Sequence, residues 1–252
     1  MEDNADIREY INDSLSNDFK VLQASNGEEG AQMAFKHIPD VIVSDIMMPK
    51  MDGIEMMRMV KQDIRTSHIP VVLLTAKDSI EDKTSGYEGG ADSYLTKPFS
   101  ARLLTTRIQS LIKNRHKLAE WISSQKSLNA LPQVEANVED TGFSVIDRDF
   151  IDKLNKIIEE NIVQEDITVP FLAENMNMSH ATFYRKVKAL TNMTAKEYVR
   201  KKKLQHCYEM LKTGEHNVNE VAFLTGFKQL AHFREVFKTE FGILPSDVNK
   251  QK

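Results

Sequence analysis

Short apolar runs of strand length alternate with amphipathic helical stretches along the first half of the chain. Ile7, Ile11 and Leu15 recur at intervals of four residues, which predicts a helix over residues 5–16 with one buried stripe. The other runs predict strands over residues 19–24, 41–43, 71–74 and 93–95, and helices over residues 27–37, 54–61, 80–88 and from 101 past 113. This alternation is typical of an α/β fold with a doubly wound parallel sheet.

The second half has a different pattern. Residues 116–146 mix Ser, Asn, Gln and acidic residues around Pro132 and Gly142, so we expect a linker that is helical at its start. Helical patterns separated by short turns then continue to the last residue, which predicts an all-α domain. The chain is therefore expected to hold a first domain over residues 1–115, the linker, and a second domain over residues 147–252.

Composition places the chain in a broad class. Its 252 residues suffice for two domains, and 41% hydrophobic with 28% charged residues is typical of soluble globular proteins. No run approaches the roughly 20 apolar residues of a membrane helix. One cysteine excludes an internal disulfide framework, and residues 1–4 lack the basic and apolar regions of a signal peptide. These features favour a cytoplasmic location.

Charge is divided unevenly. Residues 1–115 hold 14 Lys+Arg against 18 Asp+Glu, a net charge of -4, whereas residues 151–252 hold 16 against 13, a net charge of +3. Between residues 179 and 203, eight basic residues face Glu197 as the sole acid. A solvated helix face and a nucleic-acid surface both explain such a run, and charge alone does not separate them.

Polar side chains follow the predicted strands of the first half. Asp45 comes just after one buried strand, Thr75 after the next and Lys97 after the last, while Glu2 and Asp3 precede the first helix. The carboxyl ends of parallel strands form the ligand edge of such a sheet. Three carboxylates, a lysine and a hydroxyl gathered there would suit Mg²⁺ and a phosphoryl group. A lone aspartate after a strand is usually a cap or turn residue, so the prediction depends on the whole set.

In order and spacing, these residues resemble the receiver domains of bacterial two-component response regulators, which have a flavodoxin-like fold. The resemblance covers residues 1 to about 115. Six motifs carry it: Glu2-Asp3-Asn4, Ser44-Asp45-Ile46-Met47-Met48-Pro49, Met51-Asp52-Gly53, Leu74-Thr75-Ala76, Gly90-Ala91-Asp92 and Leu95-Thr96-Lys97-Pro98-Phe99.

The resemblance implies a role for each residue of the set. Asp45 is the expected phosphoacceptor, and Thr75 and Lys97 are expected to bind phosphoryl oxygens. Tyr94 matches the switch aromatic of the family, although an ordinary half-exposed strand tyrosine is the alternative. The Lys97–Pro98 peptide bond is expected to be cis. The expected Mg²⁺ ligands are the carboxylates of Glu2, Asp3 and Asp45 and the backbone carbonyl of Met47.

Two positions depart from the family pattern. Lys50 stands where many receivers have glycine. Receivers also carry an apolar strand before the acidic pair, whereas only Met1 precedes Glu2 here. We therefore expect a piece of a longer protein in which Glu2 and Asp3 are poorly anchored.

Two helix-turn-helix patterns lie in the second half. The first covers residues 169–175 and then a helix that begins after Ser179, its expected N-cap. The second covers residues 218–225 and 229–240. A long helix over residues 194–211 separates them and is expected to bury Leu204, Cys207, Tyr208 and Leu211, which makes Cys207 a core residue and not a reactive thiol.

Residues 147–249 resemble the AraC-type DNA-binding domain. The motifs that carry this resemblance are Leu172-Ala173, Phe183-Tyr184-Arg185-Lys186, Gly226-Phe227, Phe233, Phe237-Lys238 and Phe241-Gly242-Ile243-Leu244-Pro245. It implies two recognition helices in successive major grooves of DNA. Glu235 stands where the family often has arginine. The expected DNA contacts are His180, Thr182, Arg185, Lys186, Gln229, His232 and Arg234.

Together these features predict a transcriptional regulator that binds double-stranded DNA when a histidine kinase phosphorylates Asp45, as a homodimer in that state. The domain order resembles the C-terminal end of hybrid two-component systems, in which a membrane sensor and a histidine kinase precede these domains in one polypeptide. We expect Mg²⁺ as the cofactor. The chain itself is not expected to be an enzyme beyond assisting its own phosphorylation.

Two other functions are compatible with parts of the pattern. One is a constitutive DNA-binding regulator whose receiver serves only dimerisation. The other is a phosphohydrolase with Asp45 as nucleophile, which would need a second carboxylate for acid/base catalysis. The segment after Asp45, Ile46-Met47, offers none.

Overall fold

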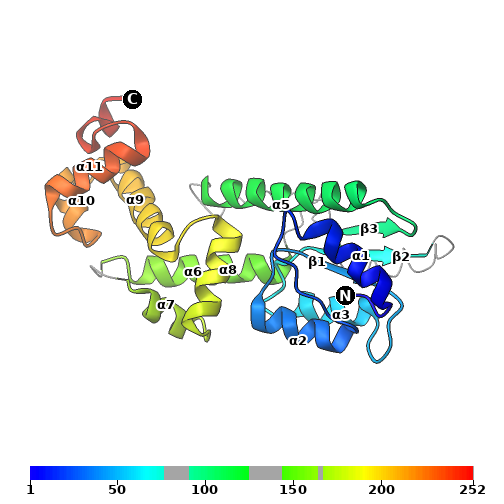
Figure 1. Ribbon diagram of the computed structural model, residues 1–252. Coiled ribbons are helices and arrows are strands. Elements are labelled where there is room, and N and C mark those ends of the chain that lie inside the picture. The colour runs from blue at the N-terminus through cyan, green and yellow to red at the C-terminus, as the bar shows by residue number, and fades with distance from the viewer. Residues whose placement is uncertain (77–90, 125–143, 164–166, 252) are drawn as a thin grey trace. The chain divides into compact units, whose positions relative to one another are not determined.

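The computed structural model describes residues 1–76, 91–124, 144–163 and 167–251 (Figure 1). It divides into two compact units, one made of Met1–Glu120 and Val134–Arg148, the other of Trp121–Gln133 and Asp149–Lys252. The helix expected over residues 80–88 lies outside the described residues, as does most of the expected linker.

The first unit is built on a parallel sheet. Its described strands are β1 (Ile42–Asp45), β2 (Val71–Thr75) and β3 (Ser93–Thr96), in the order β1-β2-β3. Asp45 pairs with Leu74, and Thr75 pairs with Thr96, so all three strands end at the same edge. The helices are α1 (Ala5–Leu15), α2 (Gly27–His37), α3 (Gly53–Gln62) and α5 (Ala101–Ser124).

Helices cover both faces of this sheet, because successive strand side chains point to opposite sides. Val71 and Leu73 of β2 belong to a core shared with α2 and α3. Val72 and Leu74 belong to a second core, shared with α1 and α5. Figure 1 shows α5 on one side of the strands and α2 with α3 on the other. The expected doubly wound α/β fold is confirmed.

The strand expected over residues 19–24 is wrong, since these residues belong to no strand. The Glu2 amide donates to the Ala24 carbonyl at 3.2 Å. A strand requires a repeating ladder of such bonds, and apolar side chains alone do not supply one. Val21 and Phe19 instead pack against the core under α1 and α5.

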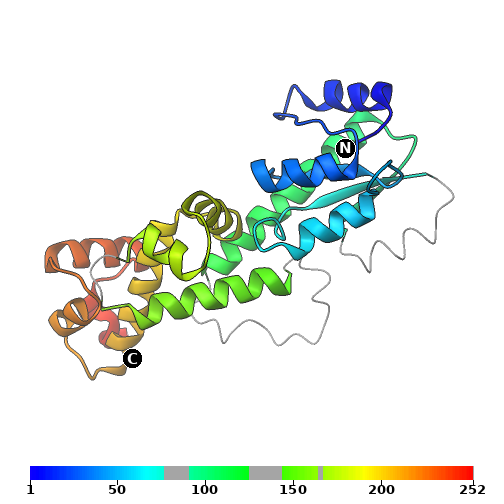
Figure 2. The ribbon, with the colours of Figure 1, turned by 90° about the horizontal axis from the view of Figure 1, so that it is seen from below.

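The second unit is helical throughout its described residues (Figure 2). This confirms the all-α expectation. Helix α6 begins in the first unit and continues in the second. None of the described helices is both long and apolar enough to cross a membrane. The helices are α6 (Val145–Glu160), α7 (Val169–Asn175), α8 (His180–Thr191), α9 (Ala195–Thr213), α10 (Val218–Leu224), α11 (Leu230–Phe241) and the 3₁₀ helix η3 (Pro245–Gln251).

Helix α9 anchors the core of the second helix-turn-helix pair. Leu204, Cys207 and Leu211 are buried together with residues of α10 and α11, as expected from their spacing, whereas Tyr208 packs against this core but is only partly buried. The Cys207 thiol donates to Thr225 Oγ1 at 3.2 Å, and burial raises the pKa of Cys207 to about 11. Cys207 is therefore a core residue. Ser179 caps α8 by accepting from the Thr182 amide at 3.2 Å, which confirms the expected N-cap.

Candidate functional site

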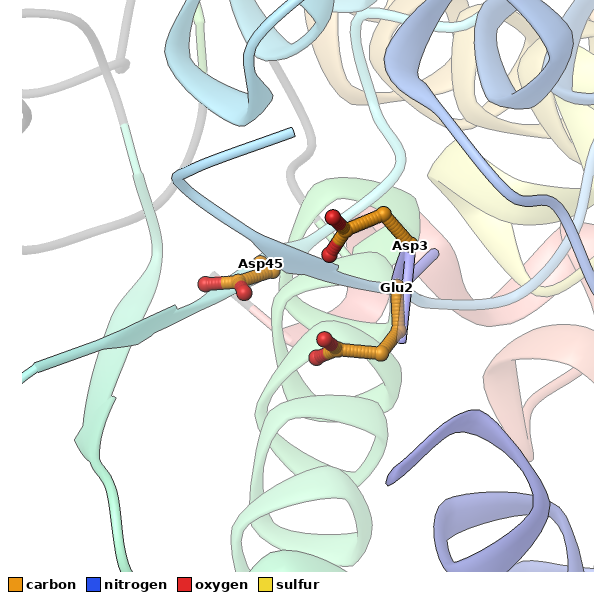
Figure 3. Close-up of side chains that lie close together, drawn as sticks. All are labelled: Glu2, Asp3 and Asp45. Atoms are coloured by element: carbon orange, nitrogen blue, oxygen red, sulfur yellow. The ribbon is translucent and has the colours of Figure 1, made fainter. Parts of the chain in front are cut away.

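Three carboxylates converge at the carboxyl end of β1. Glu2, Asp3 and Asp45 each offer an oxygen, and these oxygens all lie within 4.8 Å of one another. Figure 3 shows the three side chains together, Asp45 from the strand end and the other two from the segment before α1. Glu2 is 2% exposed, whereas Asp3 lies at the surface. Oxygen ligands of this kind are those that Mg²⁺ takes, so the residues present fit the ion.

Backbone hydrogen bonds hold the acidic pair in place. The Met1 nitrogen donates to the Val43 carbonyl at 2.7 Å, and the Asp45 amide donates to the Met1 carbonyl at 3.0 Å. Residue 1 thus pairs with β1 on both sides of Ser44, and Glu2 is bonded to Ala24. The expectation that Glu2 is poorly anchored is wrong, because these bonds replace part of the expected strand.

Arg8 of α1 adds a second support, which the sequence motifs did not indicate. Its Nη1 donates to the Glu2 carbonyl at 2.7 Å and to the Asp3 carbonyl at 3.1 Å. One guanidinium therefore fixes the backbone of both acidic residues. The only sequence signal was a basic residue five positions after Asp3, which by itself reads as an ordinary helix-surface cation.

Lys97 lies among the carboxylates. Its Nζ is 2.7 Å from Asp45 Oδ2 and 2.8 Å from Glu2 Oε2. Burial lowers the pKa of Lys97, but the hydrogen bonds to Asp45 and Glu2 outweigh it, so the net pKa is raised above its ordinary value and the ammonium stays charged. The peptide bond between Lys97 and Pro98 is cis, as expected.

Thr75 lies on β2, the strand next to that of Asp45, and Tyr94 lies on β3, the strand beyond it. Thr75 ends β2, is 1% exposed, and its hydroxyl donates to the Ala76 carbonyl at 3.1 Å. Tyr94 of β3 is half-buried and packs against the core under α2 and α3. The structure thus brings Thr75 to the edge that holds Asp45 and places Tyr94 on β3, which pairs with the strand of Thr75.

The loop after Asp45 has two special backbone positions. Lys50 adopts a left-handed conformation, with φ 69°, as the family glycine at this place would suggest. At Gly53, a Cβ atom would collide with the Asp45 carbonyl oxygen, and the Gly53 amide donates to the Ile46 carbonyl at 2.9 Å. Met47 lies in this loop with its side chain 75% exposed.

Most of the expected DNA contacts lie at the surface of the second unit. His180 and Arg185 of α8 are exposed and Thr182 is partly exposed. Gln229, His232 and Arg234 are exposed at the start of α11. Side chains two residues apart on a helix point in directions about 200° apart. His232 and Arg234 therefore lie on opposite sides of α11, and Glu235 lies between them around the helix.

Lys186 does not lie with these residues, and the expectation that it contacts DNA is contradicted. It is 0% exposed, and its Nζ lies 5.6 Å from the centre of the Phe150 ring. Phe183, Lys186, Val187 and Leu190 are buried at intervals of three and four, so Lys186 falls within the apolar stripe of α8. The spacing of these four residues in the sequence predicts burial of Lys186, whereas the basic run around it suggests exposure.

Comparison with known proteins assigns a family to each half. Residues 1–109 match the model of the response regulator receiver domain, and residues 172–251 match a helix-turn-helix domain of the AraC type. Histidine kinase P4 of Formosa agariphila is 33% identical over 98% of this chain and 17% of that protein. The alkaline phosphatase synthesis transcriptional regulatory protein PhoP of Bacillus subtilis is 41% identical over 43% of this chain and 44% of that protein.

The chain thus spans less than half the length of these two relatives. Among solved structures, the receiver domain of sensor histidine kinase PA1611 from Pseudomonas aeruginosa PAO1, which has a magnesium ion coordinated in its active site cleft, is 25% identical. The alignment covers 45% of this chain and 93% of that one, with a TM-score of 0.43.

Proposed function

Because residues 1–109 are a response regulator receiver domain and residues 172–251 an AraC-type helix-turn-helix domain, we propose that the chain regulates transcription in a two-component system through phosphorylation of Asp45. The observation that carries this proposal is the position of Asp45. Its carboxylate ends a buried strand, lies beside two further carboxylates and bonds to Lys97 at 2.7 Å. This set of groups suits a phosphoryl group and its counter-charges better than a structural ion pair.

The reaction is a transfer from a phosphohistidine of a kinase. An Asp45 carboxylate oxygen forms a bond to phosphorus while the bond from phosphorus to the histidine nitrogen breaks, and the imidazole leaves. Lys97 lies within 2.7 Å of the attacking carboxylate and donates to oxygens of the transferred group, which stabilises their charge. Mg²⁺, held by Glu2, Asp3, Asp45 and the Met47 carbonyl, would neutralise the remaining charge.

The response to phosphorylation involves Thr75 and Tyr94. A phosphoryl group on Asp45 offers new acceptors to the Thr75 hydroxyl, which now donates to the Ala76 carbonyl. Movement of Thr75 changes the packing next to Tyr94 on β3, the strand adjacent to β2. A change in the Tyr94 side chain would then alter the surface of the receiver around β3. We propose that a second copy pairs with this surface in the phosphorylated state.

The helical half suits two neighbouring major grooves. Helices α7 and α8 form one helix-turn-helix and α10 and α11 the other, with α8 and α11 as recognition helices. The connecting helix α9 has 19 residues, a length of about 28 Å at 1.5 Å per residue, which approaches one turn of DNA. The base contacts we propose are His180, Thr182, Arg185, Gln229, His232 and Arg234.

The test combines phosphorylation and DNA binding on the same chain. The protein is incubated with acetyl phosphate and Mg²⁺, and incorporation of phosphate is measured by intact mass. Affinity is measured by fluorescence anisotropy on duplexes enriched from a random pool by the protein itself. We expect phosphate on the wild type and tighter DNA binding, and neither change in Asp45→Asn.

Asp40→Asn is the matched control, because Asp40 is an exposed carboxylate that precedes β1 at the other end of the strand. This variant should behave as the wild type. DNA affinity that is the same in every state would support the constitutive regulator and would show that phosphorylation does not regulate DNA binding. Continuous release of inorganic phosphate from small phosphoesters would instead support the phosphohydrolase.

A further inference from the structure

A second group of buried charges lies at the edge of the receiver sheet opposite Asp45. Its centre is Asp147, in the first turn of α6, whose side chain is 0% exposed. Ser67, 1% exposed in the segment between α3 and β2, donates its hydroxyl to Asp147 Oδ1 at 2.8 Å. The two residues are 80 positions apart, so this bond joins the start of α6 to the receiver core.

One receiver cation contacts this carboxylate, and a second is close enough to feel its charge. Arg115 of α5 places Nη1 at 3.9 Å from Asp147 Oδ2, and its side chain is 16% exposed. Lys61 of α3 binds Asp92 at 2.6 Å and donates to the Ile69 carbonyl at 2.8 Å. Burial lowers the pKa of Lys61, Asp92 opposes this, and the charges of Arg115 and Asp147 also act on it. The receiver thus supplies two cations, Lys61 and Arg115, and the carboxylates of Asp92 and Asp147 balance their charge.

Helix formation alone does not explain the burial of Asp147. An acidic residue in a first turn is favoured by the helix dipole while fully exposed to water. Removing a carboxylate from water is costly unless charged and hydrogen-bonding partners compensate. Here the partners come from α5 and from the segment before β2, and the Asp147 amide is bonded to Ser144 Oγ at 3.1 Å. The site is therefore shaped by the receiver around this one carboxylate.

We propose that Ser67 and Arg115, with Lys61 beside them, form a docking site on the receiver for the carboxylate of Asp147. Its occupant is the segment that leads into the helical domain in sequence, residues 144–148. This site is separate from the phosphorylation edge and does not depend on Asp45 chemistry. Its role is to tie the first turn of α6 to the receiver.

The test is hydrogen–deuterium exchange of the whole, unphosphorylated chain, read by mass spectrometry. Asp147→Asn keeps the size of the side chain and removes its charge. We expect amides of residues 144–150 and of residues 63–69 to exchange about tenfold faster or more, as for loss of a charged hydrogen bond. Peptides from α2 and α11 should be unchanged. Asp149→Asn, at an exposed position on the same helix, is the matched control and should exchange as the wild type.

Two results would overturn the proposal. One is unchanged exchange in both segments, and the other is faster exchange of equal size throughout the receiver, which would mark Asp147 as a general stability residue. Ser67→Ala is a milder second variant, judged by the same two criteria if Asp147→Asn does not fold. In urea unfolding, the double variant should lose less stability than the sum of the single variants.

Discussion

The backbone around Asp45 leaves no space for side chains at two glycines. A Cβ atom on Gly53 would collide with the Asp45 carbonyl oxygen, and one on Gly27 would lie 2.5 Å from the Met51 carbonyl oxygen. Both glycines are the first residues of helices, α3 and α2, and both contact the same stretch of chain from Asp45 to Met51. The position of Asp45 at the end of β1 is therefore linked to the positions at which α2 and α3 begin.

Substitution of Gly53 by alanine should disturb the site directly. The added methyl group must displace the Asp45 backbone, and overpacking of this kind costs about 1–3 kcal/mol of unfolding free energy. Urea unfolding measures the loss, and acetyl phosphate incorporation should be slower. Gly30→Ala is the control, because the nearest atoms to its Cβ belong to the flexible Met1 side chain, which can shift, and not to the backbone. Equal losses in the two variants would contradict the proposed contact.

Lys50 presents the opposite case, because its side chain is carried by a left-handed backbone. Glycine adopts this conformation without the Cβ clash, although it loses more entropy on folding. Relief of the clash is worth about 1–2 kcal/mol and the glycine entropy costs about 0.5–1 kcal/mol, so Lys50→Gly should raise the free energy of unfolding by about 0.5–1 kcal/mol. Lys50→Ala, which keeps the Cβ atom, should give no such gain. A loss of stability in the glycine variant would show that the lysine side chain itself stabilises the loop.

Arg8 is expected to position the proposed metal ligands. Arg8→Gln removes the donor that holds both the Glu2 and Asp3 carbonyls, and outer-shell changes of this kind weaken metal binding about tenfold. Calorimetric titration with Mg²⁺ measures the effect, and Arg102→Gln on α5 is the control. Tighter Mg²⁺ binding in Arg8→Gln would mean that the guanidinium acts only through its positive charge.

At the scale of elements, local patterns predicted most of the structure. Helical patterns located the described helices of the first unit and α7 to α11 of the second, and apolar runs located β1, β2 and β3, because each of these elements buries a face that its own residues define. Two kinds of feature were missed. Residues 19–24 have a strand-like composition but no ladder, and the bond from Ser67 to Asp147 joins positions 80 apart. Both depend on distant partners that no local pattern contains.

Lys186 shows the same limit within a single helix. Its place in a basic run predicts a position on the DNA surface, whereas its position in the apolar stripe of α8 buries it. The convergence of Asp45, Thr75 and Lys97 at one edge was predictable because the carboxyl ends of the strands meet in any parallel sheet. Arg8 was not, since its role depends on how the segment before α1 folds back.

Helix α9 begins with a capping box that should make its stability depend on pH. The Glu197 carboxylate accepts from the Thr194 amide at 2.8 Å and from its hydroxyl, and these bonds lower the pKa of Glu197 below its ordinary 4.5. A depressed pKa contributes stability above the ordinary value and loses it as pH falls through the folded value. Glu197→Gln should therefore lose less unfolding free energy between pH 7 and pH 3 than the wild type, as measured by urea titration. Glu174→Gln serves as the control.

At the scale of the whole chain, the two halves carry opposite net charges, -4 for residues 1–115 and +3 for residues 151–252. The basic half gains affinity for DNA through release of counterions, so its binding must weaken as salt is added. The acidic half would gain further negative charge through the proposed phosphorylation of Asp45. The proposed partners of the two halves therefore have opposite charges, a cation for the acidic half and a polyanion for the basic half.

The salt dependence of DNA binding should separate surface cations from buried ones. The slope of log affinity against log salt is negative, and its magnitude should fall by about 0.9 for each phosphate contact removed. Arg185→Ala, on the exposed face of α8, should weaken binding. If Arg185 contacts a phosphate, the magnitude of the slope should also fall, and if it contacts a base, the slope should stay the same. Lys186→Met, at a buried position, should leave the slope unchanged. A reduced slope for Lys186→Met would contradict its place in the core.

Cys207 is the single thiol of the chain, it is buried, and burial raises its pKa to about 11. Only thiolates react readily with maleimides, so at neutral pH this sulfur is almost silent toward such reagents. A cysteine introduced at an exposed site on α6 or α8 would therefore carry a dye or spin label alone. The native protein already provides the unreactive background that such labelling usually requires mutation to create, and its own motions become accessible to spectroscopy without altering its core.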